Sequence, residues 1–396
     1  MQKKDFPIFA NNPWLVFLDN AASTQKPQFV IDGVSTFVAN DYANIHRGLY
    51  SLSEKSEEAY HHSKELVGEL LNCKASEIIY SYNSTYAINL IAHSLVVSDV
   101  INTWDTVLVW IREHHSNILP RQLLAKRKKF NVEFFSITDE YEIDRNDFDQ
   151  KYTDKVKVVS VAHVSNVTGK IYDVKKIKSK LRDDTFFLVD GSQSVPNFPV
   201  DVQDIGCDCL VFTGHKMMAY TWIWVMYLKK ERIKKLTPAF LGGGTVEDVD
   251  IQWYTLQNNS DKFEPWTPNI IWAVSLLKAL EYIKSIGWMK KIREHEQKLV
   301  KLCLDGFKKY QDNIEILWPL NSDRVAVFSF LITNMTNFNK IGETFSEQNI
   351  AIRCGGHCAY PLHKHFQKSW TCRMSAYIYN DEADIAKFFE TLGQIT

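Results

Sequence analysis

Short apolar stretches rich in β-branched residues alternate with stretches of helical periodicity between about residue 77 and residue 228. In the helical stretches, such as 87–95 and 174–181, apolar side chains recur every three or four residues, so each connection can cover one face of a sheet. This alternation is typical of an α/β fold with a largely parallel sheet. We therefore predict seven strands, at 77–81, 106–110, 132–137, 156–162, 185–190, 209–213 and 221–228.

The pattern changes after Pro268 to a long helical region, from residue 270 to about 310, which is followed by strand-like runs at 326–332 and 350–353. This change predicts a second, smaller α+β domain at the C-terminal end. The expected architecture is a large α/β domain over 14–270, with a mostly parallel seven-stranded sheet flanked by helices, and a small domain over 271–396 joined by residues 1–13.

The composition fits a globular protein of this size, since the 396 residues are 45% hydrophobic and 23% charged. The chain carries 46 basic and 47 acidic residues, and its net charge is -1. Nothing in this balance favours nucleic acid or an anionic membrane surface as a partner. We expect neither partner.

Two features of the sequence suggest a reducing compartment. The first residues lack the continuous apolar region of a signal peptide, and the longest apolar run, 222–228, is too short to span a bilayer. The seven cysteines are an odd number spread through a large chain, which favours free thiols over a disulfide framework. We expect a cytoplasmic protein whose thiols are available for chemistry.

Two strand ends carry the side chains that one cofactor requires. Asp190 ends the strand predicted at 185–190, and Lys216 follows the strand predicted at 209–213. Ligands of such sheets bind beyond the carboxyl ends of the strands. Pyridoxal phosphate needs a lysine to hold its aldehyde as a Schiff base and a carboxylate to keep its pyridine nitrogen protonated. This pair predicts a pyridoxal phosphate enzyme.

Three other strand ends carry polar groups that suit the same cofactor. Ser84 and Thr85 open a predicted helix, where a phosphate would bind; taken alone, they are an ordinary helix cap. His114 could stack on a ring and shuttle protons, although adjacent histidines are also found at surfaces and in metal sites. Asn166 could donate a hydrogen bond to a phenolic oxygen, or could be a turn residue.

The segment 353–361 is the second informative region, because paired glycines and a proline predict a bent, exposed loop that carries a thiol next to a histidine. Arg353 and His357 are candidates for lowering the thiol pKa. Cys354 and Cys358 could also form half of a zinc site, but no second cysteine pair accompanies them. Arg373 could bind a substrate carboxylate in bidentate fashion, or could form a surface salt bridge.

Together these residues resemble one family over nearly the whole chain, the SUF-type (group II) cysteine desulfurases of the class V aminotransferases, within the fold type I pyridoxal phosphate enzymes. The set of ordered matches is specific, although no single match is. The similar segments are 17–23, 46–48, 113–115, 163–167, 190–193, 214–216, 242–244, 267–269 and 353–361.

The resemblance implies a homodimer and assigns roles at the cofactor. Lys216 would bind the cofactor aldehyde, Asp190 would pair with the pyridine nitrogen, and His114 would stack on the ring. Asn166 and Gln193 would contact the phenolic oxygen. The resemblance also implies phosphate contacts from Ser84, Thr85, Thr213 and His215, and from Thr267 of the other subunit.

The resemblance further implies the substrate and the product. L-cysteine would be anchored by Arg373 and Arg353, Cys358 would take its sulfur as a persulfide, and L-alanine would leave. A sulfur-acceptor protein of the SUF system would receive the sulfur for iron–sulfur cluster assembly. The alternatives are selenocysteine lysis, another fold type I reaction such as transamination, and a homologue that retains the fold with impaired catalysis.

The sequence departs from the family at its phosphate loop and at several tryptophans. The loop usually reads Arg-Gly-Thr-Thr-Glu-Gly, whereas residues 82–87 keep the hydroxyls but lose an arginine and two glycines. Tryptophans also stand where the resembling proteins carry glycine, and the chain has only 16 glycines. Our hypothesis is that some of these tryptophans arise from UGA codons that are read as glycine in the source organism but have been translated as tryptophan. The alternative is genuine divergence with compensating changes nearby. The positions are Trp104, Trp222, Trp224, Trp266, Trp272 and Trp318.

Overall fold

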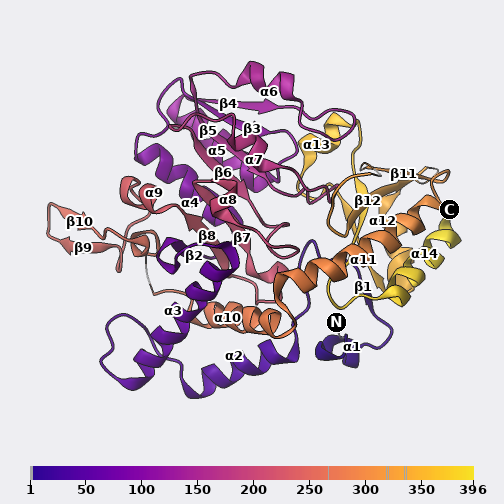
Figure 1. Ribbon diagram of the computed structural model, residues 1–396, viewed down its shortest axis with the longest axis horizontal. Coiled ribbons are helices and arrows are strands. Elements are labelled where there is room, and N and C mark those ends of the chain that lie inside the picture. The colour runs from indigo at the N-terminus through magenta and orange to yellow at the C-terminus, as the bar shows by residue number, and fades with distance from the viewer. Residues whose placement is uncertain (1–2, 266, 318, 320, 334, 336) are drawn as a thin grey trace.

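The computed structural model describes residues 3–265, 267–317, 319, 321–333, 335 and 337–396, so Trp266 and Trp318 lie outside the described residues. A seven-stranded sheet forms the centre of the larger part, and the C-terminal elements, in orange and yellow, lie beside it (Figure 1). Its strands run in the order β2-β8-β7-β6-β5-β3-β4. They are β2 (Ile78–Ser81), β3 (Thr106–Trp110), β4 (Asn131–Phe135), β5 (Val156–Ala162), β6 (Phe186–Asp190), β7 (Cys209–Thr213) and β8 (Trp224–Leu228).

These seven strands confirm the mostly parallel sheet predicted from the sequence. The neighbouring strands from β4 to β7 pair in parallel, and β8 is antiparallel to both β7 and β2. Strands β6 and β7 are buried along their whole length, which explains why they read as continuous apolar runs. Asp190 and Thr213 end these two strands, so polar side chains that follow them meet at one edge of the sheet.

Helices cover both faces of the large sheet, as each apolar stripe requires. Buried side chains of α4 (Ser84–Val97), α5 (His115–Lys128) and α9 (Lys230–Lys235) form one core with the sheet. The opposite core contains side chains from the helices on the other face. These are α2 (Gln28–Asn40), α3 (Ser51–Leu71), α6 (Arg145–Lys151), α7 (Val174–Lys178), α8 (Val202–Ile205) and α10 (Ile270–Ser285).

A four-stranded antiparallel sheet of order β11-β12-β15-β14 organises the C-terminal part. This confirms the expected smaller α+β domain. The strand expected at 326–332 is β12, whereas the run at 350–353 divides into β13, which pairs with the N-terminal β1, and β14. The elements are β1 (Val16–Phe17), β11 (Ile314–Ile316), β12 (Val327–Ile332), β13 (Ile350–Ala351), β14 (Arg353–Gly355), β15 (Thr371–Ser375), α12 (Phe338–Glu347), α13 (Tyr360–His365) and α14 (Glu382–Ile395).

The helical region expected from residue 270 to about 310 consists of α10 and α11 (Trp288–Lys308), which are separated by Ile286 and Gly287. Helix α11 joins the two parts of the molecule, because Met289 and Ile292 pack in a large-sheet core while Leu299 packs in the small-sheet core. The division of the chain at residue 270 stays a prediction.

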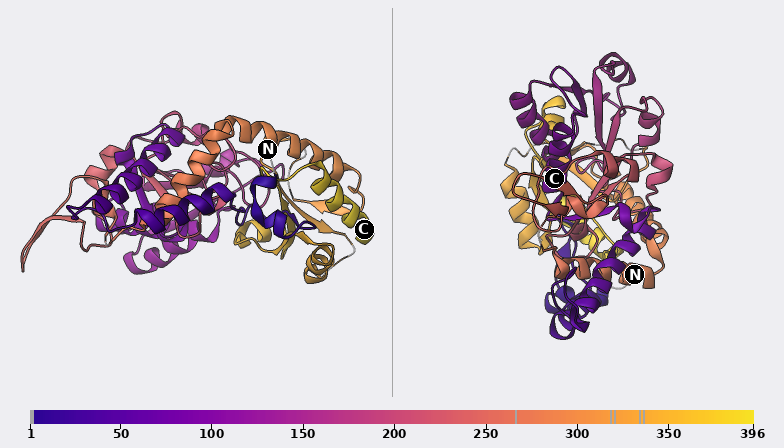
Figure 2. Two further views of the ribbon diagram at one scale, coloured as in Figure 1. Left: turned by 90° about the horizontal axis from the view of Figure 1, so that it is seen from below. Right: turned by 90° about the vertical axis from the view of Figure 1, so that its left-hand side faces the viewer.

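A hairpin formed by β9 (Val246–Val249) and β10 (Tyr254–Leu256) projects from the large part of the molecule (Figure 2). Its side chains include exposed apolar ones, among them Ile251 and Trp253. The sequence pattern did not predict this hairpin. No helix within the described ranges is long and apolar enough to cross a membrane.

Candidate active site

A cavity of about 320 Å³ lies at the carboxyl ends of the parallel strands. All of the candidate residues from the sequence line it except Thr213 and Thr267. They come from both parts of the molecule, since Lys216 and Asp190 follow the large sheet while Cys358 and Arg373 belong to the C-terminal part. A larger cavity of about 800 Å³, near Tyr172 and Lys176, contains none of the candidate residues.

Lys216 and Asp190 face the cavity from the ends of neighbouring strands. Lys216 ends a tight turn, Gly214–Lys216, that requires glycine at 214, where a Cβ would lie 2.6 Å from Ile223. Burial lowers the pKa of Lys216 to about 8, and the Asp190 carboxylate opposes this fall. Asp190 is buried and accepts a hydrogen bond from the Ser192 N–H at 2.9 Å. The Lys216 amine can therefore be neutral near pH 8, and the Asp190 carboxylate that shares its cavity is held in place by a hydrogen bond.

His114 is the N-cap residue of α5, and its ring lines the cavity. The Ser116 N–H donates to His114 Nδ1 at 3.2 Å, so the neutral ring carries its proton on Nε2. Burial lowers the pKa of His114, and the charge of Lys216 lowers it further. A neutral ring next to Lys216 is suited to stacking on a flat ligand.

The side chains of Ser84 and Thr85, which are expected to bind phosphate, do not cap the helix. Asn83 caps α4 instead, because its Oδ1 accepts from the Tyr86 N–H at 2.7 Å. The Ser84 hydroxyl lies 3.2 Å from that of Ser192, and both Ser84 and Thr85 line the cavity. The helix start therefore offers hydroxyls and N–H groups to an anion.

Two other expected phosphate contacts do not reach this cavity. Thr213 is fully buried at the end of β7, and its Oγ1 has no hydrogen-bond partner among the described residues. Thr267, which is expected to serve the other subunit, is exposed and lies outside the cavity lining. His215 lines the cavity, and burial lowers its pKa to about 3, so its ring is neutral.

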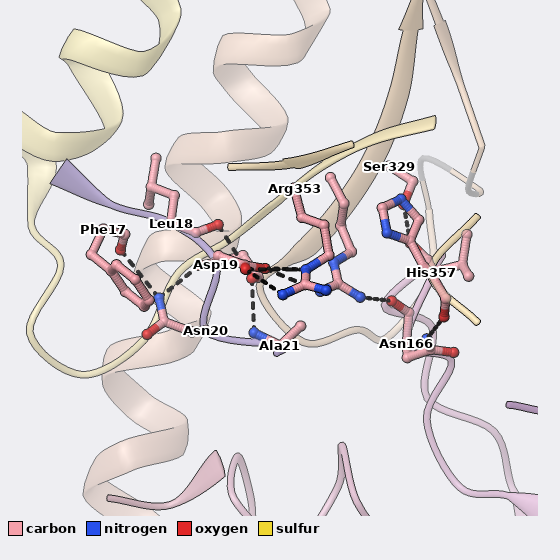
Figure 3. Close-up of polar contacts among 12 residues, drawn as sticks. Phe17, Leu18, Asp19, Asn20, Ala21, Asn166, Ser329, Arg353 and His357 are labelled. Atoms are coloured by element: carbon pink, nitrogen blue, oxygen red, sulfur yellow. Dashed lines mark hydrogen bonds and ion pairs between the residues drawn. The ribbon is translucent and has the colours of Figure 1, made fainter. Parts of the chain in front are cut away.

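Arg353 and Arg373 share one carboxylate, that of Asp19 (Figure 3). Arg353 Nη2 lies 3.0 Å from Asp19 Oδ2, and Arg373 Nη2 lies 3.2 Å from Oδ1. The Arg373 side chain is only 3% exposed, which rules out a surface salt bridge, whereas Arg353 is half exposed. Two cations against one anion leave a net positive charge, which suits a substrate carboxylate.

The cysteine loop is held over the cavity in an unusual backbone conformation. His357 and Cys358 both have positive φ, at 49° and 54°, and the Cys358 side chain is exposed while it lines the cavity. The Asn166 amide, for which a cofactor contact is predicted, lines the cavity and donates to the His357 carbonyl at 2.8 Å (Figure 3). Asn166 thus joins the loop to the large sheet.

The expectation that His357 supplies positive charge to the thiol is wrong. Its Nε2 lies 3.1 Å from the carbonyl of Thr371, to which it donates, and burial holds the pKa of His357 well below its usual range. The ring is therefore neutral and directed toward β15. Arg373 is instead the buried cation within electrostatic reach of Cys358.

Cys354 pairs with Cys372 on the neighbouring strand and does not form half of a metal site with Cys358. Its Sγ lies 2.8 Å from Sγ of Cys372, its partner across β14 and β15. These two residues adjoin the opposed pair Arg353 and Arg373, and alternation along the strands places the thiols on the opposite face of the sheet. Within the described ranges, no group of three or more histidine, cysteine or acidic side chains could hold a metal ion.

Two of the six tryptophans, both within the described ranges, have a backbone conformation that suits glycine. Trp104 and Trp222 both have φ of 73°, in the left-handed region that bulky residues rarely adopt. Trp224 is nearly buried in the cavity lining, with its ring 5.8 Å from that of His215. Trp272 is half-buried, and its Nε1 has no partner among the described residues.

The described residues fit pyridoxal phosphate. The cavity volume lies in the range of small-molecule sites, roughly 300–1,000 Å³. It brings together a lysine amine, a buried carboxylate, a neutral imidazole and the hydroxyls of a helix start. Gln193 lines the same cavity and is held by a hydrogen bond from its Nε2 to the Ala21 carbonyl at 2.8 Å.

Two residues of this site were not assigned from the sequence. Asp19 holds both arginines, yet nothing near it in the chain indicates that role, although it lies in one of the segments similar to the family. His115 contacts the cysteine loop. The one feature of the sequence that could have indicated this role is its position beside His114. Both contacts join positions more than 200 residues apart.

Comparison with protein families places the chain among known enzymes. Residues 16–388 match the family model described as aminotransferase class-V. A probable cysteine desulfurase of Pyrococcus abyssi is 34% identical over 99% of this chain and 96% of its own length. The cysteine desulfurase of Wigglesworthia glossinidia brevipalpis is 33% identical over 99% of this chain and 96% of its own length.

Solved structures agree with the sequence comparison. The apo structure of a cysteine desulfurase from Thermococcus onnurineus NA1 has a TM-score of 0.92 and 30% identity, and covers 99% of this chain and 96% of its own. The Escherichia coli cysteine desulfurase CsdA, solved as an S-sulfonic acid, has a TM-score of 0.89 and 25% identity, with the same coverage of both chains.

Proposed function

The chain belongs to the class-V aminotransferase family, in which it is a cysteine desulfurase, and we propose that it removes the sulfur of L-cysteine with pyridoxal phosphate. The products are L-alanine and a persulfide on Cys358. One observation carries this proposal: the Lys216 amine, the Asp190 carboxylate and the Cys358 thiol line a single cavity. Within the family, we propose that the chain is of the SUF-type group II, a proposal that the ordered motifs support.

Each residue that would hold the cofactor has a distinct task. Lys216 would bind its aldehyde, Asp190 would hold the proton of its pyridine nitrogen, and His114 would stack on its ring. Ser84 and Thr85 would bind its phosphate at the start of α4. When bound, pyridoxal phosphate supplies an electron sink that makes the substrate α-carbon acidic and labilises the sulfur.

The two arginines orient the substrate. Arg373 is buried and fixed by Asp19 and by the Asn166 carbonyl, which accepts from its Nη1 at 2.9 Å, so its position is set before the substrate enters. Arg353 adds a second positive charge at the more exposed side of the cavity. A carboxylate held there directs the rest of a small amino acid toward Lys216.

Lys216 acts at the α-carbon of the substrate, and Cys358 acts at its sulfur. With its lowered pKa, Lys216 Nζ can take up the α-proton when its amine is neutral. The Cys358 thiolate attacks the substrate sulfur, so that the new sulfur–sulfur bond forms as the carbon–sulfur bond breaks. The persulfide then lies on an exposed residue, from which a second thiol can reach it.

The same exposure supports a protein partner. We propose that a sulfur-acceptor protein of the SUF system takes the persulfide sulfur for iron–sulfur cluster assembly. We also propose a homodimer, since Thr267 is exposed away from this chain's own cavity and the β9–β10 hairpin presents apolar side chains. Free thiols persist in reducing compartments, so a cytoplasmic location is proposed as well.

The experiment that tests this function measures alanine and sulfide released from L-cysteine by the cofactor-loaded protein. Equal amounts of both products are expected from the unmodified chain in the presence of a thiol reductant. L-selenocysteine in parallel distinguishes the lyase alternative, because alanine formed from it alone would exclude desulfuration of cysteine. A protein that binds the cofactor but forms neither product would be the impaired homologue.

A further inference from the structure

His115 contacts the cysteine loop with its backbone. As the first residue of α5, it has an N–H group that no residue of its own helix can satisfy. That N–H donates to the Cys358 carbonyl at 2.8 Å. The backbone of Cys358 is therefore joined directly to the start of α5, one residue beyond His114.

The His115 side chain makes a second contact with the same loop. Its Nε2 lies 3.1 Å from the backbone N of Tyr360, the first residue of α13. The two rings also pack together, with centroids 4.9 Å apart. Each of the two helices thus has an N-terminal N–H satisfied by the other segment, and His115 provides both connections.

The cysteine loop that leads into these contacts does not hold its shape by local preference. His357 and Cys358 are consecutive residues with positive φ, a conformation that costs non-glycine residues free energy. Such a conformation persists when surrounding groups fix it, and here the fixing groups are His115 on one side and Asn166 on the other. Loss of either contact allows the loop to relax.

We propose that His115 is a positioning residue that holds Cys358 over the cavity to receive sulfur, and that breaking its contact with Tyr360 frees the loop. This inference rests on the proposed role of Cys358. The geometry that carries it is the pair of hydrogen bonds that join His115 to the Cys358 carbonyl and to the Tyr360 N–H, two residues further along the loop.

The ring contact depends on protonation. His115 Nε2 accepts the Tyr360 N–H only when the ring is neutral, and burial lowers the pKa of His115, which keeps it neutral. The contact is complete above the ordinary imidazole pKa of about 6.5 and is lost as the pH falls through the lowered value. The groups around the ring are His114 on its own helix, His363 and Tyr360 on α13, and Cys358.

The test compares three variants of the cofactor-loaded protein. His115→Ala removes the ring acceptor, and His115→Gln keeps an acceptor oxygen that does not titrate. His62→Ala, an exposed histidine on α3, is the matched control. The readouts are the alkylation rate of Cys358 by iodoacetamide, followed by peptide mass spectrometry, and amide hydrogen exchange of residues 356–360, each from pH 5 to pH 8.

His115→Ala should raise both rates roughly threefold to tenfold at pH 8, the loss expected for one hydrogen bond. At acid pH the rates of the unmodified protein and of the control should converge on those of His115→Ala measured at the same pH. His115→Gln should stay slower than His115→Ala at every pH. Unchanged rates in His115→Ala, or equally fast rates in His115→Gln, would overturn the inference. Neither readout requires turnover, so failure of the proposed function would appear separately, as absence of alanine.

Discussion

Arg353 and Arg373 stand directly opposite each other on β14 and β15, and their guanidinium groups meet at the single carboxylate of Asp19. The same two strands bring Cys354 and Cys372 together on the other face. The register between β14 and β15 therefore fixes the positions of both arginines and of the residues where the Cys358 loop begins. This arrangement links substrate binding to the position of the sulfur acceptor.

Replacing the buried arginine should cost more than replacing the exposed one. Arg373→Lys removes a planar donor held by Asp19 and the Asn166 carbonyl, so kcat/KM for L-cysteine should fall by about 10- to 100-fold. Arg353→Lys should cost less than about tenfold, because the half-exposed group is screened by solvent. Steady-state kinetics of both variants checks the order, and a larger loss in Arg353→Lys would contradict it.

The lowered pKa of Lys216 should set the pH dependence of cofactor capture. Only the neutral amine attacks an aldehyde, so the rate should rise about tenfold per pH unit below pH 8 and level off above it. The measurement is the growth of the visible absorbance when the cofactor-free protein is mixed with pyridoxal phosphate. A rate that still rises tenfold per unit beyond pH 10 would indicate an amine with an ordinary pKa.

Removal of the amine should abolish turnover without unfolding the protein. Lys216→Ala should lower the rate of alanine formation by at least about 10³-fold, and Lys216→Arg should do the same, because a guanidinium neither binds the aldehyde nor gives up a proton. Circular dichroism of both variants should match that of the unmodified protein. Substantial activity in either variant would remove Lys216 from the chemistry.

Glycine at two of the tryptophan positions should stabilise the fold. Trp104→Gly and Trp222→Gly relieve positive φ at exposed residues, and each should raise the free energy of unfolding by about 1–3 kcal/mol in denaturant titrations. Trp14→Gly, at an exposed tryptophan without positive φ, should give no such gain.

The codon hypothesis has its own direct measurement. Mass spectrometry of the protein isolated from its source organism should find glycine at positions 104, 222, 224 and 272 if the codons are reassigned. Tryptophan at these positions, encoded by UGG, would end the hypothesis and establish genuine divergence. In that case Trp224 remains part of the cavity lining, and cofactor affinity should increase in Trp224→Gly.

The sequence predicted those parts of the site that lie next to a strand with a clear apolar pattern. Strands β6 and β7 are buried apolar runs followed by Asp190 and Lys216, so the apolar runs predicted the sheet edge and the residue types after them predicted the candidate cofactor residues. The contacts of Asp19 and His115 could not be predicted, because they join segments far apart in the chain through the packing of two domains. The β9–β10 hairpin escaped prediction because its residues are largely exposed and show no buried face.

The conformation of the cysteine loop explains why the role expected of His357 is wrong. His357 adjoins Cys358 in sequence, which suggested a charged partner, but its ring is buried against Thr371 and stays neutral. Adjacent side chains of a bent loop point in different directions, so a residue next to Cys358 in the sequence did not place a positive charge next to its thiol. Arg373, fifteen positions away, is the cation within electrostatic reach of the thiol.

The central claim, that Cys358 receives the substrate sulfur, is tested most directly by trapping the persulfide. The cofactor-loaded protein is mixed with L-cysteine without reductant and alkylated, and its cysteine peptides are weighed. We expect one additional sulfur on Cys358, absent in Lys216→Ala and unaffected in Cys354→Ser. Alanine formation without any sulfur on Cys358, or sulfur found on Cys354 instead, would contradict the account.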